Sequence, residues 1–118
     1  MPDLDLLQGT LDFLILRTLA WGPMHGFGVA RWIRGVTDGT LQIDDGALYP
    51  ALHRMEHRGW ILADWGITEN NRRAKFYRLS AKGRKQLQAQ TATWQRYASA
   101  VTQVIRASGA ARQAADTP

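Results

Sequence analysis

The stretch that decides the fold is DDGALYPALHRMEHRGW, residues 44–60. If it is helical, at about 100° per residue, its side chains fall on two unlike faces. One face is apolar and consists of Leu48, Ala51, Leu52 and Met55. The opposite face is polar and free of carboxylates, and it consists of Gly46, Pro50, His53 and His57, flanked by Tyr49 and Arg54. We therefore predict a helix over residues 44–59 with one face in a core and the other toward a partner.

Length and composition narrow the class of protein. The chain has 118 residues and is 45% hydrophobic, which suits one domain with its own core. It has no cysteine, which excludes disulfides and thiolate metal sites and fits a reducing compartment. The acidic start, Met1–Asp5, is unlike a signal peptide, and the longest apolar run, Phe13–Leu16, is too short to cross a membrane. We expect a cytoplasmic protein without a membrane partner.

The charge is basic and unevenly distributed. The formal net charge is +5, which favours a polyanionic partner without choosing between nucleic acid and a membrane surface. One segment holds seven bases and no acid: Arg72, Arg73, Lys75, Arg78, Lys82, Arg84 and Lys85. Such a run is often only a solvated face. The position of this basic segment after the helix of residues 44–59 is therefore a better indication of a binding role than the number of its charges.

Start and stop signals predict one order of elements. Thr10 and Ser80 suit helix N-caps, Gly59 suits a helix end, and Asn70 and Asn71 suit a hairpin loop because asparagine tolerates positive φ. The predicted elements are helix 10–20, helix 24–35, a turn at 37–39, a short edge strand at 41–43, helix 44–59, strand 60–65, loop 66–73, strand 74–79 and helix 80–107. This order is typical of a winged helix-turn-helix, an α+β fold that is mostly α.

Two of the predicted helices raise specific expectations. In helix 24–35, we expect Phe27, Ala30 and Ile33 to face inward. Helix 10–20 is apolar nearly all round, so Leu11 and Leu14 are expected to contact a second subunit as well as their own core.

The C-terminal helix carries a seam with alternating spacings of four and three residues. The seam consists of Leu87, Thr91, Trp94, Ala98, Val101 and Ile105. Little chain follows to cover it, so we predict a homodimer. The expected division is a DNA-binding domain at 1–79, a dimerisation helix at 80–107 and a disordered tail at 108–118.

Together these features indicate double-stranded DNA as the partner. The helix of residues 44–59 would enter the major groove, and the wing of residues 66–75 would grip the backbone or minor groove. The candidate DNA-binding residues are Tyr49, Pro50, His53, Arg54 and His57 on the helix, and Asn71, Arg72, Arg73 and Lys75 on the wing. The alternative is a winged-helix module that binds another protein and uses its basic wing only for solubility.

The helix also contains H-x-x-E-H at residues 53–57, a pattern found in some zinc proteases. A catalytic zinc needs a third protein ligand and a dry cleft, and the chain has only one other histidine. We therefore read His53 and His57 as part of the groove-facing surface. We expect no metal, no cofactor and no enzymatic activity.

Several blocks of this sequence resemble the PadR family of bacterial transcriptional regulators. They are LQGTLD at 7–12, GPMHGFG at 22–28, GALYPAL at 46–52, GW at 59–60 and ENNRRAKFYRL at 69–79. The resemblance extends from about Leu7 to Leu87, and the C-terminal helix matches by type and place. Phe27 stands where tyrosine is frequent, which we expect to be neutral for packing.

The resemblance implies a homodimeric repressor on an inverted-repeat operator, with the third helix in the major groove and the wing on the backbone or minor groove. In some members, a small aromatic or cationic effector binds between the C-terminal helices, where a tryptophan stacks on it. Trp94 resembles that tryptophan. The alternative for Trp94 is packing in the dimer core alone.

Overall fold

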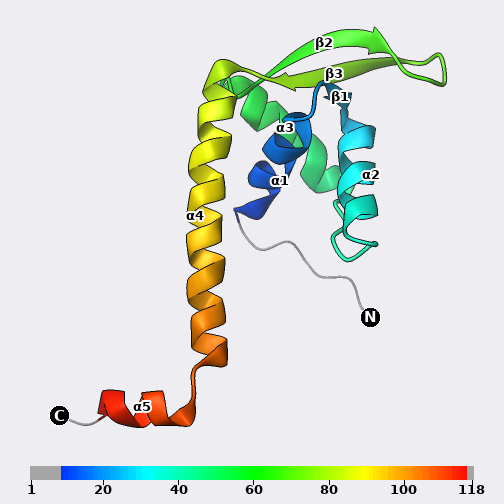
Figure 1. Cartoon of the computed structure of the whole chain (residues 1–118). Coiled ribbons are helices and arrows are strands. Elements are labelled where there is room, and N and C mark those ends of the chain that lie inside the picture. Colours follow the sequence, from blue (N-terminus) through cyan, green and yellow to red (C-terminus); the bar gives the residue numbers. More distant parts are fainter. Residues whose placement is uncertain (1–8, 117–118) are drawn as a thin grey trace. The chain divides into compact units, whose positions relative to one another are not determined.

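The computed structural model describes residues 9–116 (Figure 1). Expectations for Met1–Asp5, and for Leu7 and Gln8, lie outside these residues. The elements are α1 (Thr10–Leu19), β1 (Met24–His25), α2 (Gly26–Val36), α3 (Asp45–His57), β2 (Ile61–Ile67), β3 (Arg73–Leu79), α4 (Ala81–Arg106) and α5 (Gly109–Asp116). The chain divides into two units, one ending at Gln88 and the other beginning at Ala89. Among residues 9–116, no helix is long and apolar enough to span a membrane.

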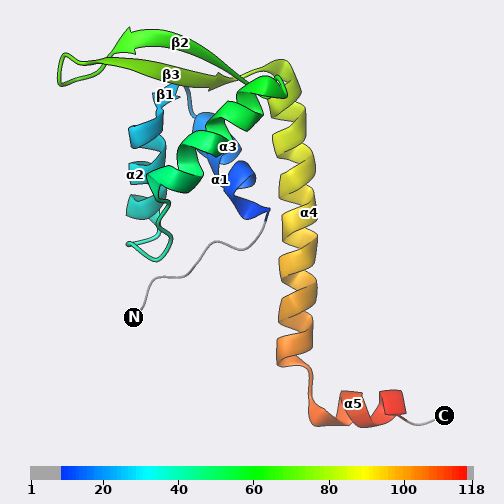
Figure 2. The same cartoon turned by 180° about the vertical axis from the view of Figure 1, so that it is seen from behind.

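The predicted two-faced helix is confirmed. Asp44 caps α3, because its side chain accepts a hydrogen bond from the backbone N–H of Ala47 at 2.9 Å. The expected apolar stripe lies in the core, with Leu48, Leu52 and Met55 fully buried and Ala51 1% exposed. They pack with buried side chains of α1, α2 and the sheet: Ile15, Leu16, Leu19, Val29, Ile33, Ile61, Tyr77 and Leu79. Viewed from behind, α3 lies in front of α1 (Figure 2). Pro50, His53 and His57 on its polar face are exposed.

The sheet is three-stranded and antiparallel in the order β1-β3-β2. The β2–β3 hairpin is the predicted wing, and its register pairs Ile61 with Leu79 and Ile67 with Arg73. The third strand is β1, which pairs Met24 with Tyr77. The prediction of an edge strand at residues 41–43 was wrong, because only Leu41 forms an isolated β-bridge there. The physical reason is local, since the backbone N–H of Leu41 donates to the Thr37 hydroxyl at 3.1 Å within the turn that precedes it.

The expected inward face of α2 also needs correction. The helix buries Val29 and Ile33, whereas Phe27 is 63% exposed. At about 100° per residue, Phe27 lies about 120° round the helix from Ile33 and cannot share its face. Gly26 takes the inward place in the first turn and is buried.

The end of α3 and the start of α4 are joined by backbone contacts. The amides of Gly59 and Trp60 donate to the carbonyls of Glu56 and Met55, each at 3.0 Å, with Gly59 at φ 76°. This is the Schellman arrangement that ends a helix at a left-handed glycine. As predicted, Ser80 caps α4, since its hydroxyl accepts from the amide of Gly83 at 3.0 Å.

Gly83 is required at this junction because α4 passes directly over the chain after α3. A Cβ atom built on Gly83 would overlap the carbonyl group of Trp60. The same serine hydroxyl that caps α4 also donates to that carbonyl at 3.0 Å. The junction therefore sets where the first turn of α4 lies on the winged-helix unit.

Part of the predicted disordered tail, residues 108–118, is helical in the structure. Residues Gly109–Asp116 form α5, and the Ser108 hydroxyl accepts from the amide of Ala111 at 3.3 Å. Alanine has the highest helix propensity, and four of these eight residues are alanine, so the segment favours a helix despite its lack of buried residues.

We predict that Gly83→Ala destabilises the protein by about 1–3 kcal/mol, the usual cost of forcing a group into filled space. The measurement is urea unfolding at one fixed protein concentration. Gly35→Ala is the matched control, because Gly35 also lies in a helix but a Cβ there meets nothing within 4 Å. The control should gain up to about 1 kcal/mol of helix propensity. Equal effects of the two substitutions would contradict the close approach.

Candidate nucleic-acid interface

The outward face of α3 holds the predicted helix contacts. Pro50, His53 and His57 are exposed, and Tyr49 is 45% exposed at one flank. The face is about three turns long, and the diameter of an α-helix suits the width of a major groove. It offers imidazole donors and acceptors, a phenol and an apolar ring. Two acids lie at the start of the helix, the cap Asp44 and Asp45 in the first turn.

Tyr49 is held by the first turn of α2. A Cβ atom built on Gly26 would come within 2.9 Å of Cε1 of the tyrosine ring. The ring therefore rests directly on the backbone of Gly26. The glycine at this position, which weakens a helix by about 1 kcal/mol relative to alanine, is explained by this contact.

Arg54 lies on the other flank and is paired within the chain. Its Nη2 atom lies 2.6 Å from Oδ1 of Asp12 on α1, and the side chain is 45% exposed. The planar guanidinium has further donors beyond the one used by Asp12. The carboxylate therefore fixes the orientation of Arg54 and offsets its charge, which favours directed hydrogen bonding over simple attraction to phosphate.

Lys75 is likewise engaged, with its Nζ atom 3.1 Å from Oε1 of Glu56 on α3. The hydrogen bond that Lys75 donates to Glu56 raises the pKa of Lys75 above its ordinary value, so this side chain stays charged. Burial raises the pKa of the neighbouring Tyr77, which keeps its phenol neutral. The Lys75–Glu56 pair ties the wing to α3, a role that the sequence did not indicate.

The tip of the wing is a tight turn that presents its arginines. Asn71 has the predicted positive φ, at 58°, and its amide donates to the carbonyl of Thr68 at 2.9 Å. The amide of Thr68 in turn donates to the carbonyl of Arg72 at 2.8 Å. Arg72 and Arg73 are exposed, and no carboxylate of residues 9–116 forms an ion pair with either. They are therefore the wing cations available to a polyanion.

A groove of about 660 Å³ separates the wing from α2. Its α2 side carries Phe27 and Arg31, and its wing side carries Arg72, Arg73 and Phe76. Sequence reasoning missed Phe27 and Arg31 as surface residues, because it placed Phe27 in the core. The rings of His25 and Phe27 are stacked 6.4 Å apart at this edge.

His53 and His57 are both exposed on α3, while the intervening Glu56 is used by Lys75. Over the described part of the chain, no group of three or more His, Cys, Asp or Glu side chains is placed to hold a metal ion. The two imidazoles are thus arranged as surface donors.

The predicted dimer residues fall into two sets. Leu11, Leu14 and Leu87 are partly buried against the core of their own unit. Within residues 89–106, Trp94, Val101 and Ile105 are 36%, 39% and 76% exposed, and Thr91 and Ala98 are half-buried.

The exposed apolar face of α4 extends further round than the predicted seam. Tyr97 and Val104 are 60% and 77% exposed and lie beside Trp94 and Val101. The spacing 94–97–101–104 alternates three and four residues. The heptad rule that predicted the seam could therefore also have predicted Tyr97 and Val104 on this face. The rings of Trp94 and Tyr97 lie 6.1 Å apart.

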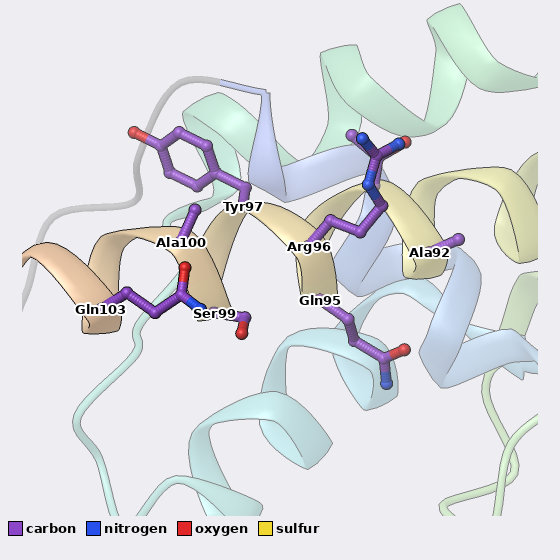
Figure 3. A pocket seen from close by; sticks show the side chains of 8 residues that line it. Ala92, Gln95, Arg96, Tyr97, Ser99, Ala100 and Gln103 are labelled. Atoms are coloured by element: carbon purple, nitrogen blue, oxygen red, sulfur yellow. The ribbon is translucent and has the colours of Figure 1, made fainter.

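A hollow of about 890 Å³ lies along another side of α4 (Figure 3). Its lining side chains, Arg96 and Ser99 among them, all belong to α4 and do not include Trp94. No second element of the described chain closes it. Tyr97 of the aromatic pair also lines it, so the hollow borders the exposed apolar face of α4.

Comparisons with known proteins agree with this geometry. Residues 15–89 match the model of the Transcriptional regulator PadR-like family. A solved transcriptional regulator from Clostridium thermocellum is 27% identical, with a TM-score of 0.76 over 84% of this chain and 96% of that chain. An uncharacterized protein of Lysinibacillus sphaericus is 28% identical over 90 residues, which cover 76% of this chain and 83% of the relative.

The chain also resembles a third protein, in its fold. The structure of Bacillus subtilis PadR in complex with operator DNA is 20% identical, with a TM-score of 0.64 over 72% of this chain and 47% of that chain.

The Lys75–Glu56 pair leads to a test of wing attachment. Glu56→Gln should loosen the wing, so backbone amides of β3 should exchange faster with deuterated water, by about fivefold or less for an exposed pair. Asp64→Asn is the matched control, because the Asp64–Arg78 pair at 3.4 Å lies within the hairpin. Hydrogen exchange that responds equally to both substitutions would show that Glu56 does not anchor the wing.

Proposed function

Because this chain belongs to the PadR-like family of transcriptional regulators, we propose that it is a homodimeric repressor that binds an inverted-repeat operator. The observation that carries the proposal is the placement of two surfaces. The carboxylate-poor face of α3 is outward, and the Lys75–Glu56 contact ties the cationic wing to that helix. The solved relative with operator DNA supports double-stranded DNA as the partner.

In this proposal, α3 lies in the major groove and reads base edges. Arg54, oriented by Asp12, bonds a guanine edge or a nearby phosphate. Tyr49, held against Gly26, donates to a phosphate or packs on a sugar. The ring of Pro50 contacts a thymine methyl group, and His53 and His57 supply further hydrogen bonds across the groove.

The wing contributes most of the affinity and little of the sequence choice. Arg72 and Arg73 are exposed and free of intrachain ion pairs among the described residues, so their full charge is available to the backbone. Contacts to phosphate release counterions, which makes the binding strongly dependent on salt. Asn71 sets the turn that carries them, and Lys75 stays beside Glu56.

The dimer would form through the exposed apolar face of α4 in two copies of the chain. A symmetric pair presents its two recognition helices to half-sites one helical turn apart, or a multiple of that. Repression would be steric, with the dimer covering a promoter. Any ligand or partner that changes the spacing of the two α3 helices would release the DNA, since both half-sites must be bound at once.

The direct test is fluorescence anisotropy with labelled promoter DNA of the protein's own operon. The proposal expects tight binding at low salt that is outcompeted by unlabelled promoter DNA far better than by a scrambled duplex. Absence of binding would support the alternative of a protein-binding winged-helix module. Equal competition by both duplexes would contradict a specific repressor.

Mutations should separate the residues that give affinity for any DNA from the residues that give preference for the promoter sequence. Arg72→Ala combined with Arg73→Ala should weaken binding to promoter DNA and to scrambled DNA with the same flanks alike, and should flatten the slope of log affinity against log salt by about 0.9 per lost phosphate contact. Tyr49→Ala should instead reduce the preference for the promoter. A uniform loss from Tyr49→Ala would place this side chain among the backbone contacts.

For the dimer, Val101→Asp should produce monomers in sedimentation velocity, because the carboxylate would have to be buried in an apolar interface. Ser99→Asp is the matched control, since Ser99 is exposed about 160° round α4 from Val101 and lines the hollow of Figure 3. The control should remain dimeric. A Val101→Asp protein that sediments as a dimer would contradict the interface.

A further inference from the structure

An exposed tryptophan on the wing is not explained by packing. Trp65 of β2 is 62% exposed, and the guanidinium of Arg73 lies 4.7 Å from the centre of its ring. This distance is typical of a cation–π contact.

The strand register shows which way this pair faces. Trp65 is opposite Lys75, and Ile67 is opposite Arg73, so these four side chains share one face of the hairpin. On that same face, Lys75 reaches Glu56 of α3. The Trp65–Arg73 pair therefore lies on the side of the wing that faces α3, the proposed reading helix.

Stacking on a ring changes what an arginine can do. A free guanidinium on a long chain samples many rotamers and loses them on binding, whereas a stacked one is already held. Arg72, the adjacent cation, has no ring contact with Trp65 and precedes the strand. The two arginines thus differ in preorganisation while sharing charge and exposure.

We propose that Trp65 is a positioning residue that holds Arg73 for entry into a narrow minor groove beside each half-site, so that the wing favours A·T-rich flanks. This inference rests on the proposed function. A·T tracts narrow the minor groove and strengthen its negative potential, which attracts an inserted arginine. The exposed ring and Ile67, 63% exposed, provide apolar surface against the deoxyribose walls.

The test uses two duplexes with the same promoter half-sites and either A·T or G·C base pairs in the flanks. Wild-type protein should bind the A·T-flanked duplex more tightly. Trp65→Ala should lower that preference by about two- to fivefold, the range of an exposed cation–π contact. Trp65→Phe should retain most of it. In Arg73→Ala protein, Trp65→Ala should have no further effect.

Two matched controls come from the same chain. Arg72→Ala should weaken binding to both duplexes equally. Trp21→Ala removes another exposed tryptophan with an arginine over its ring, Arg17 at 5.1 Å on α1, and should leave the flank preference unchanged.

The outcomes separate the two levels of the proposal. Wild-type protein that binds neither duplex contradicts the repressor function itself. Tight binding by wild-type protein with a flank preference that survives Trp65→Ala overturns the role of Trp65 alone. An equal loss from Trp21→Ala, or effects of Trp65→Ala and Arg73→Ala that simply multiply, also overturns it.

Discussion

The side chains of Leu48, Leu52 and Met55 on α3 have no exposed surface, and each such burial stabilises the fold by roughly 1.5–3 kcal/mol. Turning the helix about its axis would bring these groups into water, so its rotation is fixed. The end of α3 at Gly59 sets the direction of the chain after this helix. The contact between Gly83 and Trp60 sets the position of the first turn of α4. The polar face of α3 consequently has one orientation, and every proposed DNA contact depends on it.

The described cations fall into two groups, those paired with a carboxylate and those without such a partner. Asp12 and Glu56 hold Arg54 and Lys75 in place and offset their charges. In the proposed function, Arg72 and Arg73 are the wing cations that bind DNA, and the ring of Trp65 holds Arg73 but not Arg72. A surface built this way gains affinity from the wing and selectivity from held side chains, which is how DNA-binding proteins combine salt-dependent attraction with sequence choice.

Local rules predicted the parts that depend on near neighbours in the sequence: the two faces of α3, the cap at Ser80, the turn at Asn71 and the hairpin. Relations between distant residues were missed. Met24–His25 becomes a strand only because β3 lies beside it, and Arg54 meets Asp12 across 42 positions. The error at Phe27 came from placing it on the same face as Ile33, which lies about 120° away on the helical wheel. The PadR resemblance and the winged-helix order were recoverable because their motifs lie in contiguous blocks.

The central claim is that two copies of α3 enter the major groove at successive half-sites. Methylation of guanine N7 by dimethyl sulfate probes the major groove directly. In an interference experiment with the promoter duplex and wild-type protein, methylated guanines should block binding in two clusters. The centres of these clusters should lie about 10 base pairs apart, or a multiple of about 10 base pairs. Binding that tolerates methylation at every guanine, while still protecting the backbone from hydroxyl radicals, would contradict it.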